Sequence, residues 1–316
     1  MTKYKSRLED LPNELLTDIF KNLDARTLFR AFHNLNARLN QQIQSFGYLQ
    51  LVFHINQSNL LKTNDEIFSY YVHTLIIDPW INVNLIQFPN IRYLQLDNPL
   101  PEVLAQIKPE IISYLKHISI RYKFNMYEMD ILRDKIFSNR FIHLQSCELL
   151  EERTLMTNPN FTQSLSIKIV KVEFIDFNIY QTILSSCPNL YFLKFSIYPS
   201  NGISNKNLFL HENLKKMIID YRESDHDHRL NGFLSCVPNL EILNIHQKID
   251  FEYVQQQDWF ASVIHIHLPR LRKFKYILHL FKIPVSLNEN ILMQIQTNFN
   301  DVHNNKYKAQ LEIRRE

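Results

Sequence analysis

The amino-acid sequence predicts an α/β protein in which a small N-terminal module of three helices precedes a solenoid of stacked repeats with a parallel, concave sheet. Two observations lead to this prediction. An apolar pattern returns about every 25 residues through most of the chain, and the first fifty residues follow a different, helical pattern. We therefore expect two domains, a helical module over residues 5–50 and a solenoid over residues 51–316, with repeats at about 70–280 and a C-terminal cap at about 281–316.

The repeat has a core of the form apolar-x-x-apolar-x-apolar. Its clearest copies are Ser-Ser-Cys-Pro-Asn-Leu-Tyr-Phe-Leu-Lys-Phe at 185–195 and Ser-Cys-Val-Pro-Asn-Leu-Glu-Ile-Leu-Asn-Ile at 235–245, two periods apart. A single match carries little weight in a chain that is 45% apolar, but the near-constant spacing of the copies does. The first apolar residues of the cores, the anchors, are Val72, Ile91, Leu115, Phe141, Ile167 (or Leu165), Leu190, Leu214, Leu240 and Leu271.

Each core predicts a short strand, because its last two apolar residues lie two apart and point to one face of a strand. Apolar residues of helical spacing stand ahead of several anchors, such as Tyr180, Ile183 and Leu184, and a proline then ends the helix. Such repeats stack because none can bury its apolar face alone. A closing helix over the last open core is predicted by the spacing of Ile291, Leu292, Ile295 and Phe299.

Over residues 70 to 280 this pattern resembles the leucine-rich repeat family. The resemblance implies a curved solenoid whose parallel strands line the inside. The Asn or Cys that the family places shortly after the third apolar residue is mostly missing from this sequence. The resemblance therefore covers the strand core of the repeat and not the turn that follows it.

Residues 8–46 predict three short helices with a small shared core. Pro12 suits the first turn of the first helix, Glu14 suits its positive end, and Asp24 can cap the second helix. The third helix is expected to begin near Asn34. So small a module has little core, and we expect part of its apolar surface to face a partner or the solenoid. The apolar residues at helical spacing are Leu15, Leu16, Ile19, Phe20 and Leu23, then Leu28, Phe29 and Phe32, then Leu35, Leu39 and Ile43.

Residues 8–23 read Leu-x-x-Leu-Pro-x-Glu-Leu-Leu-x-x-Ile-Phe-x-x-Leu and resemble the F-box family. The family's tryptophan near the third helix is replaced here by Asn-Ala-Arg-Leu. The resemblance implies a substrate-recognition adaptor of a Skp1-cullin-F-box ubiquitin ligase, in which the helices dock on Skp1 and the repeats hold a protein substrate. The alternative is a non-catalytic repeat scaffold for protein–protein interaction whose helices only cap the solenoid. The resemblance implies a Skp1-facing surface that includes Leu11, Pro12, Glu14, Leu15, Ile19 and Leu23.

The outward residues of consecutive strands line up about 5 Å apart and form a ladder on the concave face of a solenoid. Lysines bias the C-terminal half of this ladder toward positive charge, which favours an acidic or phosphorylated segment of the substrate. The alternative interpretation is that the lysines only keep the surface soluble. The candidate substrate-binding residues are Tyr93, Arg121, Phe192, Lys194, Lys216, Asn244, His246 and Lys275.

No local motif supports catalysis, and we expect a protein that is not an enzyme and needs no cofactor or metal. Three glycines are too few for a phosphate-binding loop or a nucleophile elbow. The run Asp225–His228 could share a metal ion, but a solvated loop is the better interpretation. His265 and His267 are predicted to lie on one face of a strand with a structural role. A hydrolase with an unrecognised site would need a deep pocket with shifted pKa values.

Composition also bears on partners and compartment. The net charge of +3 is too small to indicate nucleic acid or an anionic membrane as a partner. No segment approaches the ~18 apolar residues of a membrane span, and the polar N-terminus does not resemble a secretory signal. Cys147, Cys187 and Cys236 form no Cys-x-x-Cys pair and are predicted to be reduced thiols, of which Cys187 and Cys236 pack helix against strand. These features indicate the cytoplasm or the nucleus.

Overall fold

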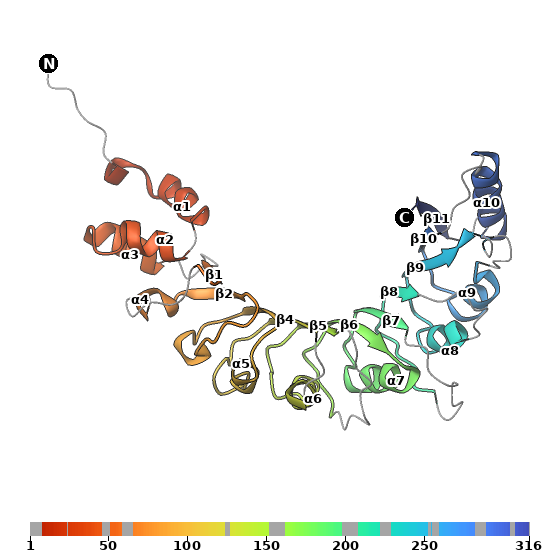
Figure 1. The fold of residues 1–316 in the computed structure, drawn as a ribbon, viewed down its shortest axis with the longest axis horizontal. Coiled ribbons are helices and arrows are strands. Elements are labelled where there is room, and N and C mark those ends of the chain that lie inside the picture. Colours follow the sequence, from red (N-terminus) through yellow and green to blue (C-terminus); the bar gives the residue numbers. More distant parts are fainter. Residues whose placement is uncertain are drawn as a thin grey trace, which may run out of the picture. The chain divides into compact units, whose positions relative to one another are not determined.

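The computed structural model is an α/β structure with an eleven-stranded sheet whose strands follow chain order from β1 to β11 (Figure 1). The described strand pairings are all parallel. The chain divides into two compact units, Met1–Arg121 and Tyr122–Glu316, and the predicted boundary near residue 50 lies inside the first. The structure describes residues 8–23, 25–45, 51–58, 66–123, 127–151, 162–197, 208–221, 229–251, 254, 259–281, 289–303 and 307–315.

Three short helices occupy the N-terminal part of the first unit. α1 begins directly after Pro12, whose carbonyl accepts a hydrogen bond from the Leu16 amide at 3.1 Å. α3 begins at Ala37, later than predicted, because Asn34 is left-handed (φ 64°) and the Asn36 side chain caps the helix by accepting from the Leu39 amide at 2.8 Å. The predicted cap Asp24 lies outside the described residues. The elements are the 3-10 helix η1 (Leu8–Asp10), α1 (Asn13–Lys21), α2 (Ala25–Phe32) and α3 (Ala37–Ser45).

The first unit continues into the repeat array. Strands begin where the anchors Val72, Ile91 and Leu115 predict them, and β1 to β4 pair in parallel with their neighbours. The first strand, β1, was not predicted, because its sequence Leu-Val-Phe-His-Ile lacks the repeat pattern. The elements are β1 (Leu51–Ile55), α4 (Glu66–Ser69), β2 (Val72–Ile77), the 3-10 helix η3 (Leu85–Gln87), β3 (Tyr93–Asp97), α5 (Pro101–Ala105) and β4 (His117–Tyr122).

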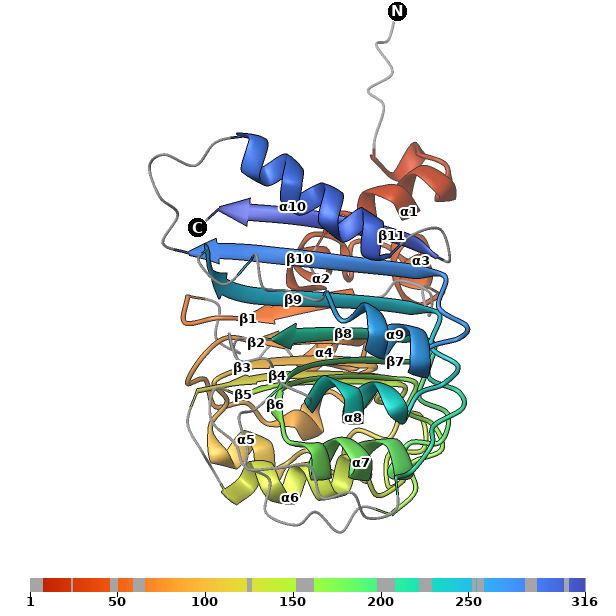
Figure 2. The ribbon, with the colours of Figure 1, turned by 90° about the vertical axis from the view of Figure 1, so that its right-hand side faces the viewer.

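The second unit alternates strands with helices, and Figure 2 shows α7 to α10 stacked in chain order on one face of its strands. Among the described residues, no helix combines the length and apolar character that crossing a membrane requires. The elements are α6 (Tyr127–Ile136), β5 (Ser146–Glu151), β6 (Ile169–Ile175), α7 (Phe177–Ser186), β7 (Phe192–Ile197), β8 (Lys216–Tyr221), α8 (Arg229–Ser235), β9 (Ile242–Asp250), α9 (Ala261–His267), β10 (Lys273–Phe281), α10 (Glu289–Val302) and β11 (Lys308–Arg315).

The core of the second unit consists of rows of apolar side chains that cross the strands. The strand register joins equivalent repeat positions, and their side chains are fully buried. Each such burial contributes about 1.5–3 kcal/mol. The helices close this core, since the Tyr180 hydroxyl of α7 donates to the Phe233 carbonyl of α8 at 2.8 Å and both rings are buried. The rows over β7 to β9 are Leu193, Met217 and Leu243, and Phe195, Ile219 and Ile245.

One predicted anchor is wrong. β5 begins at Ser146, two residues after the buried Leu144, just as β6 begins two residues after Ile167 and β7 two after Leu190. The anchor of this repeat is therefore Leu144 and not Phe141. Phe141 is also buried, and its carbonyl accepts from the Leu144 amide at 3.0 Å, so it belongs to the turn ahead of the strand. Phe141 was favoured because it lies 26 residues from both Leu115 and Ile167, although Ser146 occupies its third apolar position. Leu144, with Cys147 and Leu149, fits the full pattern.

Asparagines in the turns before the strands tie consecutive repeats together. In each case the side-chain amide donates to a backbone carbonyl in the turn of the preceding repeat, and one such bond contributes about 1 kcal/mol. The sequence predicted a helix stop at the proline ahead of several anchors, but it did not predict this role of the asparagines. The bonds join Asn90 to Tyr70 (2.8 Å), Asn189 to Leu165 (2.8 Å), Asn213 to Pro188 (2.9 Å) and Asn239 to Glu212 (3.1 Å).

The predicted closing helix is present as α10, in which Ile295 and Phe299 are buried while Ile291 and Leu292 are half-buried. The strand β11 that follows was not predicted. It pairs with β10 in parallel, so the predicted cap contains one further strand of the array. Its charged outward residues suit an edge strand, because charge on an edge disfavours pairing with another sheet.

A buried histidine takes the place of an apolar residue in one turn. Val237 and Cys187 lie three residues before their anchors, and their carbonyls accept from the anchor amides. At the equivalent His211, the ring atom Nδ1 accepts from the Leu214 amide at 3.0 Å, while Nε2 lies 2.9 Å from the Cys187 carbonyl. This arrangement requires a neutral ring with its proton on Nε2. Burial lowers the pKa of His211, although the hydrogen bond to the carbonyl partly opposes the shift.

We predict that His211 makes the stability of the repeats depend on pH. The unfolded state takes up a proton below about pH 6.5, whereas the folded ring stays neutral to lower pH, so stability falls as pH decreases below 6.5. One proton corresponds to at most about 1.4 kcal/mol per pH unit. Urea unfolding midpoints between pH 7.5 and 5.5 should decline less steeply for His211→Val, which copies Val237. An unchanged decline in this variant would contradict the assignment.

Candidate protein-docking surfaces

The apolar side chains of α1 lie on two adjacent sides of the helix. Leu16 and Phe20 are fully buried, and the Phe20 ring packs 4.9 Å from the Phe32 ring of α2. Leu15, however, is 50% exposed, and Ile19 one turn further on is only half-buried. The helical stripe predicted from the sequence is thus divided between a packed side and an outer side.

The residues that the F-box resemblance assigns to Skp1 lie on α1 and next to its ends. Pro12 and Glu14 are exposed, whereas Leu11, Ile19 and Leu23 are half-buried. These residues are mainly apolar, and they lie either on α1 or directly next to its ends. We call Leu11, Pro12, Leu15, Ile19 and Leu23 the α1 surface.

The start of α1 is held by two side chains of α3. The Arg38 guanidinium donates to the Leu11 carbonyl at 2.7 Å and to the Asn13 side-chain oxygen at 2.7 Å. The Gln42 amide donates to the Asn13 carbonyl at 2.9 Å. These contacts fix the direction of α1 against α3, so the α1 surface is presented by a rigid support.

One apolar residue that was predicted in the third helix is exposed instead of buried. Leu39 and Ile43 are buried as predicted, but Leu35 is 59% exposed. It lies in the turn before α3, and the left-handed Asn34 directs the chain there. Leu8, at the start of the described chain, is 42% exposed. The helical part of the first unit thus leaves several leucines open to solvent.

The second helix packs on the repeat array rather than outward. Leu28 and Phe29 of α2 are buried, and the Phe29 ring lies 5.2 Å from Tyr71 and 5.9 Å from Phe68. The Arg26 guanidinium stacks over the Phe53 ring of β1 at 5.1 Å. Because β1 is the first strand of the sheet, α2 covers apolar surface that the strand would otherwise expose.

The second candidate surface is the face of the second unit's sheet opposite α7 to α10, here called the helix-free face (Figure 2). Strand register arranges its outward residues in rows that run across the strands. The first row holds Phe192, Lys216, Ile242, Lys273 and Lys308. The middle row holds Lys171, Lys194, Ile218, Asn244, Lys275 and Gln310. The third row holds Ser196, Asp220, His246, Ile277 and Glu312.

Six of the eight predicted substrate-binding residues lie in these rows, and the other two lie in the first unit. Tyr93 opens β3 with its ring 6.0 Å from His117, and Arg121 of β4 lies 3.9 Å from the Asp97 carboxylate. All eight are exposed or half-buried. Within each unit, the structure therefore places the predicted residues on strands and open to solvent.

The lysines of the middle row are paired with carboxylates, and these pairs were not predicted from the sequence. Lys194 lies 3.5 Å from Asp220, Lys275 lies 2.5 Å from Glu312, and Lys171 lies 3.0 Å from Glu148. Two of the pairs join a middle-row lysine to a third-row acid on a neighbouring strand. Once β7 to β11 are aligned by their anchors, the sequence spacing of these residues could have revealed the pairs. The positive bias expected on this face is thus largely balanced in its middle.

Asp220 is the centre of a small charged cluster. The His246 ring atom Nδ1 lies 2.8 Å from one carboxylate oxygen, and Lys194 approaches the other. Burial is the largest single influence on this carboxyl and acts to raise its pKa. The hydrogen bonds from His246 and Lys194 and the lysine charge together outweigh it, and the pKa of Asp220 lies below its ordinary value.

We expect Asp220 to stabilise the protein above pH 4 and to lose this effect in acid. The folded carboxyl has the lower pKa, so its contribution is complete above the unfolded value of about 3.9 and disappears as pH falls through the folded value. Asp220→Asn should therefore lower Tm at pH 6, and the difference from the native chain should shrink toward pH 3. The exposed Asp134 of α6 provides the control Asp134→Asn, and an equal effect there would contradict the assignment.

The cysteines have the environment of packing residues. Cys147, Cys187 and Cys236 are buried free thiols. Burial raises the pKa of all three, and that of Cys187 to about 12. A thiol that stays protonated at neutral pH is a poor nucleophile and a poor metal ligand. This agrees with the predicted packing role of Cys187 and Cys236.

The histidine candidates do not form a metal site in the described part of the chain. His265 and His267 were predicted on a strand, but they lie in α9. The segment occupies the helix position of its repeat, and Pro269 in the turn that follows separates it from the strand. The Asp225–His228 run lies outside the described residues. The residues that the structure describes include no group of three or more His, Cys, Asp or Glu side chains placed to bind a metal ion.

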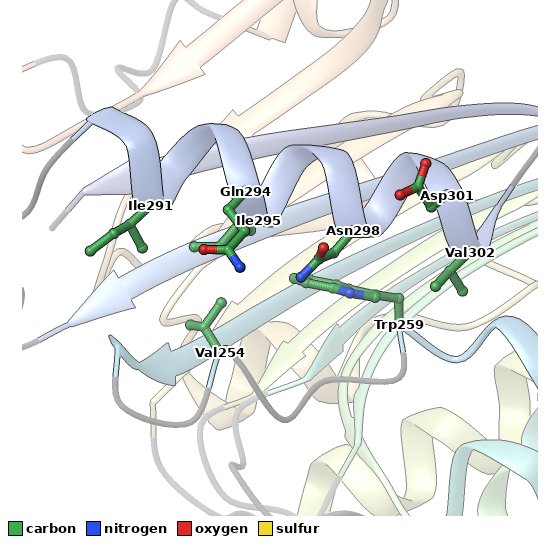
Figure 3. A pocket seen from close by; sticks show the side chains of 8 residues that line it. All are labelled: Val254, Trp259, Ile291, Gln294, Ile295, Asn298, Asp301 and Val302. Atoms are coloured by element: carbon green, nitrogen blue, oxygen red, sulfur yellow. The ribbon is translucent and has the colours of Figure 1, made fainter.

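A cavity of about 440 Å³ lies along α10 in the second unit. Figure 3 shows Val254 and Trp259 facing this side of the helix. Asp301 is the one titratable residue among its lining residues, so the cavity brings no nucleophile and base together. The lining residues are Val254, Trp259, Ile291, Gln294, Ile295, Asn298, Asp301 and Val302.

Comparison with protein-family models gives no match for this chain, and comparison with curated proteins gives none either.

Proposed function

We propose that the protein is a non-enzymatic adaptor that docks on a Skp1-like subunit of a cullin-RING ubiquitin ligase and holds a protein substrate on the helix-free face of its sheet. The docking part rests on the F-box-like residues of the α1 surface. The substrate part rests on the repeat pattern and on the aligned outward rows of the second unit. In this proposal the chain forms no covalent intermediate and needs no cofactor, and it acts in the cytoplasm or nucleus.

The observation that carries the proposal is the half-exposed Leu15 within the α1 surface. An apolar side chain on a helix of a globular protein normally faces the core, and contiguous exposed apolar surface marks interaction sites. Leu15 is 50% exposed although Leu16 beside it is fully buried. Docking of a partner would bury Leu15 and complete the burial of Ile19 and Leu23.

The capped scaffold is the second candidate, and a specific observation favours it. α2 covers β1 through Phe29 and Arg26, which is what a cap on the first repeat must do. This contact accounts for α2, but it leaves the α1 surface without a role. Capping by α2 and docking by α1 are therefore compatible within one molecule.

We predict that Leu15→Asp weakens binding of the purified chain to recombinant Skp1 by at least about tenfold, or 1.4 kcal/mol, because a charge would replace an apolar contact at the centre of the interface. The variant should keep the native Tm, since Leu15 is not in the core. Binding is measured by calorimetry. Leu165 is 53% exposed and provides the matched control Leu165→Asp, which should bind as the native chain does.

Two results would count against the docking proposal. Absence of Skp1 binding by the folded native chain would leave the capped scaffold as the better function. Equal binding by the native chain and the folded Leu15→Asp variant would remove α1 from the interface.

A further inference from the structure

The charges on the helix-free face of the second unit are distributed unevenly along the strands. In the middle and third rows, lysines face carboxylates at 2.5 to 3.5 Å. At the start of each strand the charges are not balanced in this way. The start is taken here as the first residue of the strand and the residue just before it. Over β5 to β11 these two positions hold one carboxylate, Glu241, and six cations, here called the basic edge: Lys168, Lys215, Lys216, Arg272, Lys273 and Lys308.

The basic edge is only partly neutralised. Glu241 lies 3.5 Å from both Lys215 and Arg272 and is shared between them. Lys216 stacks over the Phe192 ring at 5.0 Å. For the other three lysines, no carboxylate among the described residues lies within ion-pair distance. These are Lys168, Lys273 and Lys308.

Two of these lysines are direct neighbours across the sheet. Lys273 of β10 and Lys308 of β11 are register partners, which places their backbones about 4.8 Å apart. Like charges in this position destabilise a sheet. A bound anion would relieve the repulsion, so the pair favours the state with ligand over the state without it.

The distances between the cations of the basic edge indicate the spacing of negative charges that a ligand should have. The cations lie at the starts of β6, β8, β10 and β11, and alternate strands are about 9.6 Å apart. This distance is close to three residues of an extended polyproline II chain, in which every third side chain points the same way. Between the cations lie Tyr191, which is 52% exposed, and the half-buried Phe192 and Ile242. The edge thus combines separated positive charges with an apolar floor.

We propose that the basic edge binds an extended acidic segment of the substrate, with an anionic side chain at about every third residue. The inference rests on the proposed function, in which this face of the sheet holds the substrate, and it names the class of substrate. Carboxylates and phosphoryl groups share the required chemistry. A net charge of only +3 for the whole chain disfavours the long, uniformly charged backbone of a nucleic acid as the ligand.

The test uses fluorescent peptides of about ten residues with Glu, phosphoserine or Gln at every third position, titrated with the full chain and followed by anisotropy. The Glu and phosphoserine peptides should bind, should weaken as salt rises, and should exceed the Gln peptide by at least about tenfold. Lys273→Glu with Lys308→Glu should reduce this binding by at least about tenfold. The exposed Lys108 and Arg140 lie outside the basic edge, and their double reversal to Glu should change the affinity by less than about twofold.

The outcomes separate the alternatives. Similar affinities for the two anionic peptides would assign carboxylates as sufficient, and a phosphoserine peptide bound more than about tenfold more tightly would assign a phosphorylated substrate. Equal loss in both double variants would reduce the effect to net charge and overturn the proposal. An oligonucleotide bound more tightly than either anionic peptide would overturn it too.

Skp1 binding, measured on the same variants, keeps the two proposals distinguishable. A chain that binds Skp1 but neither anionic peptide refutes only the assignment of the basic edge. A chain that binds the anionic peptides but not Skp1 refutes only the docking function.

Discussion

The parallel alignment of buried apolar rows is the constraint on which the rest of each unit depends. Leu193, Met217 and Leu243 stack across β7 to β9 with no exposed surface, and a slip of one residue would turn such a row to solvent. The Asn189 and Asn213 side chains secure the same register at the turns by bonding the preceding repeat. Because the core fixes the register, it also fixes the positions of the outward side chains, so the rows on the helix-free face need no interactions of their own to be aligned.

Because the rows are fixed, the charge of this face depends on which side chains the register brings together and not on composition alone. Lys194 and Lys275 seemed to form a positive surface in the sequence, but their partners Asp220 and Glu312 are brought beside them by the sheet. Lys273 and Lys308 are brought together without a carboxylate between them, although 35 residues separate them in the sequence. The same register therefore neutralises one end of the strands and concentrates positive charge at the other.

Much of the fold could be predicted from the sequence because period and polarity are local properties. Strands after Leu190 and Leu240 and the closing helix around Phe299 follow from spacing alone. The failures are positions where spacing and pattern disagree or where no pattern is present. Even spacing favoured Phe141 over the observed anchor Leu144, and β1 and β11 lie outside the recognisable period. For the candidate surfaces, the sequence predicted which residues are open but not their ion pairs, because those depend on neighbours in space.

The N-terminal helices show why the α1 surface needs an explanation separate from capping. The first strand of a sheet must be covered, and α2 does this with Phe29 and Arg26. α1 is then held against α3 through Arg38 and already buries Leu16 and Phe20. Nothing in this packing requires a leucine at position 15, where a polar residue would be more soluble and equally helical. An exposed apolar residue on a helix that is already fixed by its own packing is the arrangement expected of a docking surface. The helix is ordered before the partner binds, so burial of the apolar side chain contributes directly to the affinity.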